Sequence, residues 1–127
     1  MSKMNLTIDL KGYEGSNTNT CRSNFTVHNE YVGIDLSDET LQKVTVEGSS
    51  TKTLFSVATA DAKKFIYLET SAECDIIVNG TTESTIKPII VGDTAKKGVF
   101  FKSSDIESID ITNNGTEDIT ISYITAK

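Results

Sequence analysis

The feature that most constrains the fold of this chain is its excess of β-branched residues. The sequence holds 14 Ile, 8 Val and 18 Thr, against 6 Leu, 6 Ala and 2 Met. β-Branched side chains lose rotamer freedom in a helix and pack well on a pleated sheet. A length of 127 residues suits one domain with a single core. We therefore expect an all-β fold that forms one domain over residues 1–127.

Short segments in which apolar and polar residues alternate recur along the chain, and this period of two is typical of half-buried strands. The segments expected to form strands are MNLTIDL (4–10), FTVHNEYVGIDL (25–36), KVTVEG (43–48), KTLFSVAT (52–59), KKFIYLET (63–70), ECDIIV (73–78), STIKPIIVG (84–92), KGVFFK (97–102) and ESIDIT with DITISYIT (107–125). About nine short strands with almost no helix predict an antiparallel β-sandwich, of which the jelly roll is one form.

Two segments carry the residues of tight turns. Asn79-Gly80 follows one strand directly and is a strong hairpin signal, because both residues tolerate positive φ. Asn113, Asn114 and Gly115 separate the last two predicted strands, so a second hairpin is expected there. In that hairpin Ile111 would lie opposite Ile119, and Ile109 opposite Ile121. Pro88 cannot donate to a ladder and predicts a sheet edge, a bulge or the start of a strand.

Residues 11–24, KGYEGSNTNTCRSN, are polar and glycine-containing, with almost no apolar content. A segment of this kind is expected to be a long surface loop or arm, and such loops are either functional or disordered. Tyr13 and Arg22 are its candidate contact residues, and their replacement by Ala would test whether the segment is a docking element.

Net charge argues against two classes of partner. With 12 basic and 18 acidic residues the chain carries a charge of −6, which repels a phosphate backbone and an anionic membrane. No stretch approaches the length of a membrane helix, and the first residues lack the apolar run of a signal peptide. Cys21 and Cys74 lack the spacing of zinc or redox sites, so free thiols are expected. We expect no direct contact with nucleic acid or membrane, and synthesis in a cytoplasm.

The sequence shows no combination of residues that marks an enzyme. His28 is the one histidine, and it has no zinc-binding partner pattern or nearby nucleophile. Glu69 and Glu73 could pair in glycoside hydrolysis, but the chain has no Trp to form a sugar-stacking platform. We therefore expect no catalytic residues, no metal and no cofactor.

Four aromatic residues are the remaining candidates for a site. Phe100 and Phe101 are adjacent, so in a strand one points into the core and the other points outward. Phe65 and Tyr67 alternate with Ile66 and Leu68, which makes both faces of that strand apolar. One set of faces belongs to a two-layer core, and the other is expected to contact a second sheet or a partner.

The second half of the chain resembles a known class of proteins. It contains, in order, a strand like FIYLET, a strand and turn like CDIIVNG, an apolar strand, a Ser and Asp loop and the ending IESIDITNNGTEDITISYI. This order is similar to that of small β-sandwich virion proteins of tailed bacteriophages, including crAss-like phages. The resemblance covers residues 65–127, and the first 60 residues show none. The segment GDTAKKG before GVFF departs from the glycine-containing turn of the pattern.

The resemblance implies a structural role in a virion, made in the bacterial host cytoplasm. The expected function is that of an auxiliary or decoration protein, bound in many copies to the capsid exterior. Its partners would be the major capsid protein or other virion proteins. The alternative is a component of the tail or head fibre with a carbohydrate- or receptor-binding role.

Overall fold

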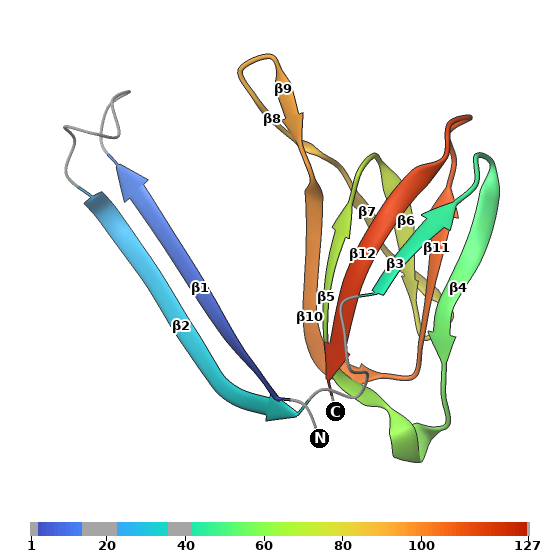
Figure 1. Ribbon diagram of the computed structural model, residues 1–127, viewed down its shortest axis with the longest axis horizontal. Helices are drawn as coiled ribbons and strands as arrows, with labels where there is room; N and C mark the ends of the chain where they lie inside the picture. Colours follow the sequence, from blue (N-terminus) through green and yellow to red (C-terminus); the bar gives the residue numbers. More distant parts are fainter. Residues whose placement is uncertain (1–2, 14–22, 36–41, 127) are drawn as a thin grey trace. The chain divides into compact units, whose positions relative to one another are not determined.

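The computed structural model describes residues 3–13, 23–35 and 42–126, and its regular elements are almost all strands (Figure 1). The strands are β1 (Lys3–Tyr13), β2 (Ser23–Asp35), β3 (Gln42–Val46), β4 (Ser50–Ser56), β5 (Lys63–Thr70), β6 (Cys74–Val78), β7 (Thr81–Ile86), β8 (Ile89–Val91), β9 (Thr94–Lys96), β10 (Gly98–Ile106), β11 (Ser108–Asn113) and β12 (Ile119–Ala126), with one 3-10 turn at Thr59–Asp61. The all-β prediction is confirmed.

The described residues form twelve strands rather than about nine. One reason is Pro88, which has no N–H to donate and separates β7 from β8 where one strand was expected. A second reason is that the predicted loop GDTAKKG contains β9, which pairs with β8 in a small hairpin of its own.

The chain divides into two compact units, residues 1–36 and 37–127. The first unit contains β1 and β2, which pair with each other in a two-stranded antiparallel sheet. The second contains two four-stranded sheets and the β8–β9 hairpin. The sandwich is therefore built by residues 42–126, and a single domain over 1–127 stays a prediction.

Both ends of the loop predicted for residues 11–24 are strand in the structure. Residues 11–13 belong to β1 and residues 23–24 to β2, and the register joins Tyr13 to Ser23. The alternation of the flanking strands continues the ladder into these polar positions, which carried no strand signal of their own. The rest of the predicted loop, residues 14–22, lies outside the described residues.

The strand order of the sandwich is that of a jelly roll. One sheet has the order β10-β5-β12-β3, and the other has the order β4-β11-β6-β7. The antiparallel pairs are nested in sequence, since β3 pairs with β12, β4 with β11, β5 with β10, and β6 with β7. Eight strands wound in this way into two sheets make a jelly roll, with β8–β9 inserted between β7 and β10.

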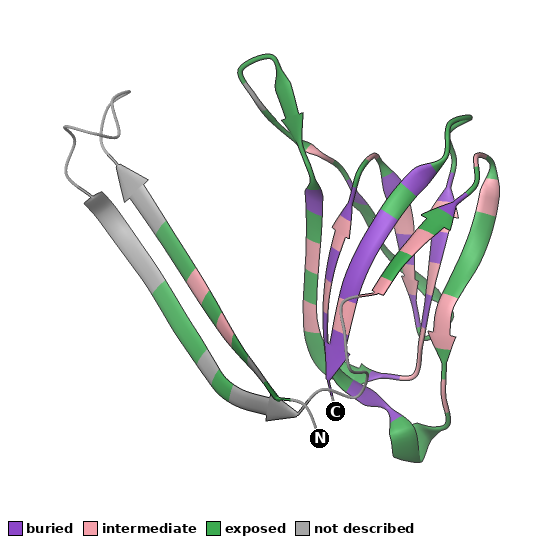
Figure 2. Ribbon diagram, viewed as in Figure 1, coloured by how far each residue is buried: buried purple, intermediate pink, exposed green. Residues whose placement is uncertain are grey.

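The core lies between the two sheets and is formed by the inward residues of each strand, drawn in purple in Figure 2. Its main members are Val46, Ile66, Leu68, Cys74, Ile76, Val78, Ile86, Ile106, Ile109, Ile111, Ile119, Ile121 and Tyr123. At the open side between β10 and β7, the Lys102 ammonium pairs with the Glu83 carboxylate at 2.6 Å. This ion pair connects the two sheets at their edges.

The prediction of a final hairpin is wrong. Strand β11 lies between β4 and β6, whereas β12 lies between β3 and β5 in the other sheet. Both edges of each strand are already paired, so neither has an edge left for the other. Ile111 therefore lies opposite Ile76, and Ile119 lies opposite Val46. The segment is an arch that crosses the sandwich, and β3 and β4 form a second arch in the same way.

The two arches contact each other at one end of the sandwich. The Ser49 N–H donates to the Gly115 carbonyl at 2.8 Å, and the Gly48 N–H donates to Oδ1 of Asp118 at 3.2 Å. A Cβ atom at Gly48 would lie 2.2 Å from the carbonyl oxygen of Thr116, so no side chain fits there. These contacts hold the first and last strands of the sandwich together.

The hairpin predicted at Asn79-Gly80 is confirmed. The two residues have φ values of 51° and 82°, as a tight turn with two positive φ angles requires. Oδ1 of Asn79 also accepts hydrogen bonds from the N–H groups of Glu107 at 2.7 Å and Ser108 at 3.2 Å. The turn residue therefore also fixes the sharp connection between β10 and β11.

Candidate interaction face

The outer surface of the β4-β11-β6-β7 sheet is polar. The hydroxyl groups of Thr51 and Thr112 lie 2.9 Å apart across neighbouring strands. The Thr85 hydroxyl donates to Asp75 at 2.6 Å, and this bond, followed by one from Asn114, lowers the pKa of the Asp75 carboxyl. These polar side chains form hydrogen bonds with one another and face water, as is usual for the solvated side of an antiparallel sheet.

The outer surface of the β10-β5-β12-β3 sheet is apolar over much of its area. Ile66 and Leu68 of β5 point into the core, so alternation places Phe65 and Tyr67 on the outside. The register places Phe101 of β10 and Ile124 of β12 on either side of Tyr67. We call this surface the aromatic face, and its residues are Phe65, Tyr67, Val99, Phe101 and Ile124.

Two rings at the centre of the aromatic face pack edge to face. The ring centroids of Phe65 and Phe101 are 5.2 Å apart, with an interplanar angle of 68°. An aromatic pair in this geometry contributes about 1 kcal/mol beyond its burial. Phe65 is buried, whereas Phe101 is 36% exposed and Val99 is 47% exposed. The face therefore has a fixed aromatic centre. Its apolar residues on β10, Val99 and Phe101, stay exposed, because β10 is the edge strand of the sheet.

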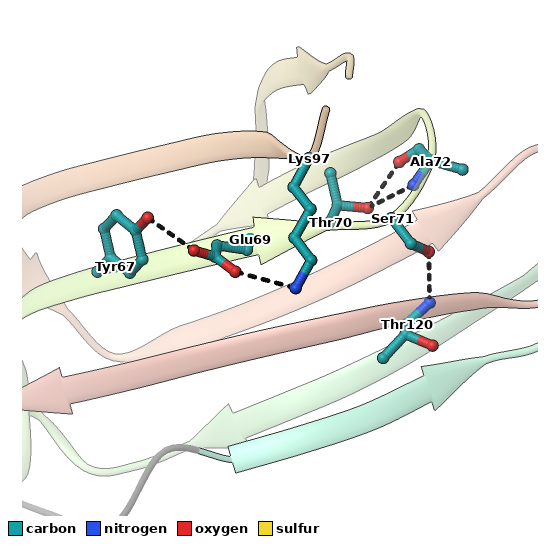
Figure 3. A network of polar contacts seen from close by, with 7 residues as sticks. All are labelled: Tyr67, Glu69, Thr70, Ser71, Ala72, Lys97 and Thr120. Carbon is teal, nitrogen blue, oxygen red and sulfur yellow. Dashed lines mark hydrogen bonds and ion pairs between the residues drawn. The ribbon is translucent and has the colours of Figure 1, made fainter. Parts of the chain in front are cut away.

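A polar network borders the aromatic face (Figure 3). The Tyr67 hydroxyl donates to Oε1 of Glu69 at 3.0 Å, and the Lys97 ammonium lies 3.3 Å from Oε2 of the same carboxylate. Burial, followed by the hydrogen bond to Glu69, raises the pKa of Tyr67. Nearby, the Thr120 N–H donates to the Ser71 hydroxyl at 2.9 Å. An apolar centre with a polar, charged margin is the usual composition of a protein interface.

The small β8–β9 hairpin, which Figure 1 shows extending beyond the end of β10, carries two more exposed apolar residues. Ile89 is 58% exposed and Ile90 is 72% exposed. Figure 2 accordingly draws most of this hairpin in the colour of exposed residues. Four of the large apolar residues exposed in the described part of the chain thus lie on two strands. They are Ile89 and Ile90 on β8, and Val99 and Phe101 on β10.

The structure brings together three of the six residues singled out in the sequence. Phe65, Tyr67 and Phe101 share the aromatic face. Phe100 points to the other side of β10, lies opposite Leu68 and packs against the core. This agrees with the expectation that one of the adjacent residues Phe100 and Phe101 points inward. The backbone of Tyr13 ends β1, but its side chain and all of Arg22 lie outside the described residues. An interface role for the six stays a prediction.

The sequence reasoning missed Ile89 and Ile90. A signal was present in KPIIV, because three consecutive apolar residues after a proline cannot all point into a core from one short strand. Ile124 was read only as part of an alternating strand, and its neighbours on the outer face became visible only with the register.

A pocket with a volume of about 420 Å³ lies at the arch end of the sandwich. Its lining includes Glu73, Glu117 and Asp118. Cys74 also lines it, and burial raises the pKa of that thiol. Asn113 is part of the lining as well, but its side-chain amide is already used in three hydrogen bonds within the arches.

Within residues 3–13, 23–35 and 42–126, no three His, Cys, Asp or Glu side chains are grouped so that they could hold a metal ion. His28 lies on the β1–β2 hairpin, with Nε2 3.5 Å from the Glu30 carboxylate. Glu69 is held by Tyr67 and Lys97, as described above. The best-defined candidate site in the described residues is the aromatic face.

Comparison with models of protein families gives no match, and comparison with curated proteins gives none either. Among the described residues, no helix has the length and apolar character of a membrane span. A function is therefore inferred from the geometry of the aromatic face and the strands around it.

Proposed function

We propose that this protein is a non-enzymatic structural component of a bacteriophage virion, an auxiliary or decoration protein bound to the capsid exterior. Its partners are the major capsid protein or other virion proteins, including further copies of itself. The observation that carries the proposal is the exposed apolar pair Ile89 and Ile90 on β8, on a sandwich whose β4-β11-β6-β7 sheet is polar.

An uncovered apolar patch bordered by polar groups marks a surface that is covered in an assembly. Ile89 and Ile90 form the tip of this surface, and burial of each side chain against a partner would be worth about 1.5–3 kcal/mol. The jelly roll supports the proposal by analogy, because viral capsid proteins use it, as do lectins. A fold alone does not assign a function, so the analogy is secondary to the surface.

Binding to the assembled shell would stabilise that shell by mass action. A protein that binds the lattice, and does not bind free capsid subunits, shifts the assembly equilibrium towards the lattice. The net charge of −6 is consistent with this location, because it disfavours contact with packaged DNA inside the shell. Many copies of a rigid sandwich, each contributing a small contact, give the shell a large total stabilisation.

Co-sedimentation with capsids that lack this protein tests the proposal, with isolated tails as the parallel sample. The proposal expects saturable pelleting with capsids at a fixed copy ratio. Ile90→Glu should weaken this binding at least about tenfold, since it places a charge on the exposed tip. Thr82→Glu is the matched control, because Thr82 is exposed on β7 of the opposite sheet. Its binding should equal that of the wild type.

Two further outcomes separate the alternatives. Pelleting with tails alone would contradict the capsid location and favour a tail or head-fibre component. Pelleting with neither sample would reject the virion proposal. Tyr13→Ala and Arg22→Ala test the two contact residues predicted from the sequence, and each should weaken pelleting if the segment that joins β1 to β2 touches the shell.

A further inference from the structure

The β1–β2 hairpin lacks what a stable sheet requires. Its two strands pair with each other, and no other described strand extends the sheet. A two-stranded sheet is at best marginally stable in water, and it becomes stable when a third strand or an apolar surface covers one of its faces. The hairpin nevertheless extends over 11 residues in β1 and 13 in β2. A hairpin of this length therefore needs another surface that packs against one of its faces.

One side of β1 is built to receive that surface. Leu6, Ile8 and Leu10 alternate with the exposed residues Thr7 and Asp9 and so form an apolar row. Leu6 and Ile8 are half-buried, but Leu10 is 54% exposed.

The aromatic face is the complementary surface. It presents Tyr67, Phe101 and Ile124 side by side on three adjacent strands, with Val99 on β10 beside them. Strand β10 is nine residues long, which corresponds to about 30 Å. The apolar residues on the outer side of β10, Val99 and Phe101, lie in the first half of this strand, and the row of β1 is apolar as well.

Neither surface is covered by the strands of its own unit. The large exposed apolar residues of the described segments are Leu10 and Val32 on the hairpin, and Ile89, Ile90, Val99 and Phe101 on the sandwich. A second copy of the chain supplies both missing surfaces at once. It brings an apolar row for the aromatic face and an aromatic face for the row.

We propose that the β1–β2 hairpin of one copy packs on the aromatic face of a second copy as a third layer, and that the exchange is reciprocal. The hairpin would pack about 10 Å above the sheet, at the usual separation of two sheets. The β8–β9 tip is left free for another partner. The inference concerns contacts between copies, so it can succeed or fail independently of the virion proposal.

The area of such an exchange is close to that of a stable interface. Eleven residues of β1 extend over about 35 Å, and two strands form a strip about 10 Å wide, so one hairpin face offers about 350 Å². In a reciprocal pair each copy gives one hairpin and receives one, so each buries about 700 Å². Standard protein interfaces bury about 800 Å² per partner.

Sedimentation velocity of the full chain over a range of concentrations tests the exchange. The wild type should associate, and Leu10→Glu or Phe101→Glu should each weaken association at least about tenfold. Thr7→Glu is the matched control for the first variant, because Thr7 lies on the other side of β1. Thr82→Glu is the control for the second, and both controls should associate like the wild type. Circular dichroism and thermal unfolding verify that each variant keeps the sandwich.

Mixing the two variants tests the geometry directly. Leu10→Glu keeps an intact aromatic face, and Phe101→Glu keeps an intact hairpin. Each variant alone should be monomeric, whereas an equimolar mixture should form heterodimers through the one intact hairpin–face contact. A wild type that stays monomeric at all concentrations, as it would if the hairpin packed on the sandwich of its own chain, would overturn the proposal. So would association that both substitutions leave unchanged, or variants that do not associate when mixed.

Discussion

Asn113 is the residue whose replacement should most clearly reveal how the arches hold the sandwich together. It is 1% exposed at the end of β11, and its Nδ2 donates to the carbonyls of Val46 at 3.1 Å and Glu117 at 2.7 Å. Its Oδ1 accepts from the Gly115 N–H at 3.0 Å. Three hydrogen bonds at about 1 kcal/mol each predict that Asn113→Ala lowers the free energy of unfolding by about 3 kcal/mol.

That loss is a large part of the roughly 5–15 kcal/mol that stabilises a typical domain, and it corresponds to a fall in melting temperature of about 15 °C. Equilibrium urea unfolding followed by circular dichroism measures it. Asn114→Ala is the control, because Asn114 is exposed and makes one side-chain bond, to Asp75, so at most about 1 kcal/mol should be lost. Asn113→Asp keeps the volume and removes both donors, so it should lose at least as much as Asn113→Ala.

The account of the arches would be refuted if Asn113→Ala lost less than about 1 kcal/mol, or if the Asn114 control lost as much. In the first case the arch would be held by the packing of the isoleucines alone. In the second case the loss would reflect a general sensitivity of the loop, and the buried amide would have no special role.

Three further predictions concern the same region. Gly48→Ala should cost at least about 2 kcal/mol in urea unfolding, because its Cβ would overlap a backbone carbonyl of the facing arch, whereas Gly115→Ala, with its nearest atom at 3.4 Å, should cost less than about 1 kcal/mol. The pKa of Asp75 is lowered in the folded state, so its contribution to stability is complete above the ordinary carboxyl pKa and is lost as pH falls through the folded value. Thermal unfolding from about pH 6 to about pH 3 should show a shallower decline for Asp75→Asn, and an unchanged decline would contradict this assignment. The Cys74 thiol is buried with a raised pKa, so in a Cys21→Ser background a thiol reagent should react with it slowly in buffer and rapidly in urea, and fast reaction in buffer would show that the core is open there.

Much of the fold follows from local pattern. The alternation in MNLTIDL predicts β1, the apolar run in KKFIYLET predicts β5, and Asn79-Gly80 predicts the β6–β7 hairpin, because these signals depend on the residues of one strand or one turn. The strands with which β11 and β12 pair were not predictable in this way, because they come from distant parts of the chain. Ile109 and Ile111 must face the core whether their strand pairs with the next one or lies across the sandwich from it.

The candidate site was predictable in part for the same reason. A strand with apolar residues on both faces signals a second buried or contacting surface, and this identified Phe65 and Tyr67. Which outward residues become neighbours depends on strand order, so the contact between Phe101 and Phe65 and the position of Ile124 beside Tyr67 required the structure. Residues 14–22 and the contact role assigned to Arg22 lie outside the described residues.

The strand order also explains when the aromatic face can form. Its central strands are β5 and β12, and Tyr67 obtains Ile124 as a neighbour only when β12 has paired with β5. Strand β12 is the last described strand, and the arch that carries it is held by Asn113 and by contacts to residues near Gly48, far earlier in the chain. Pairings between distant segments form late in folding, because the entropy of closing long loops must be overcome first. The surface proposed to bind a second copy is therefore completed by the same step that completes the core, so a partly folded chain would not yet offer it.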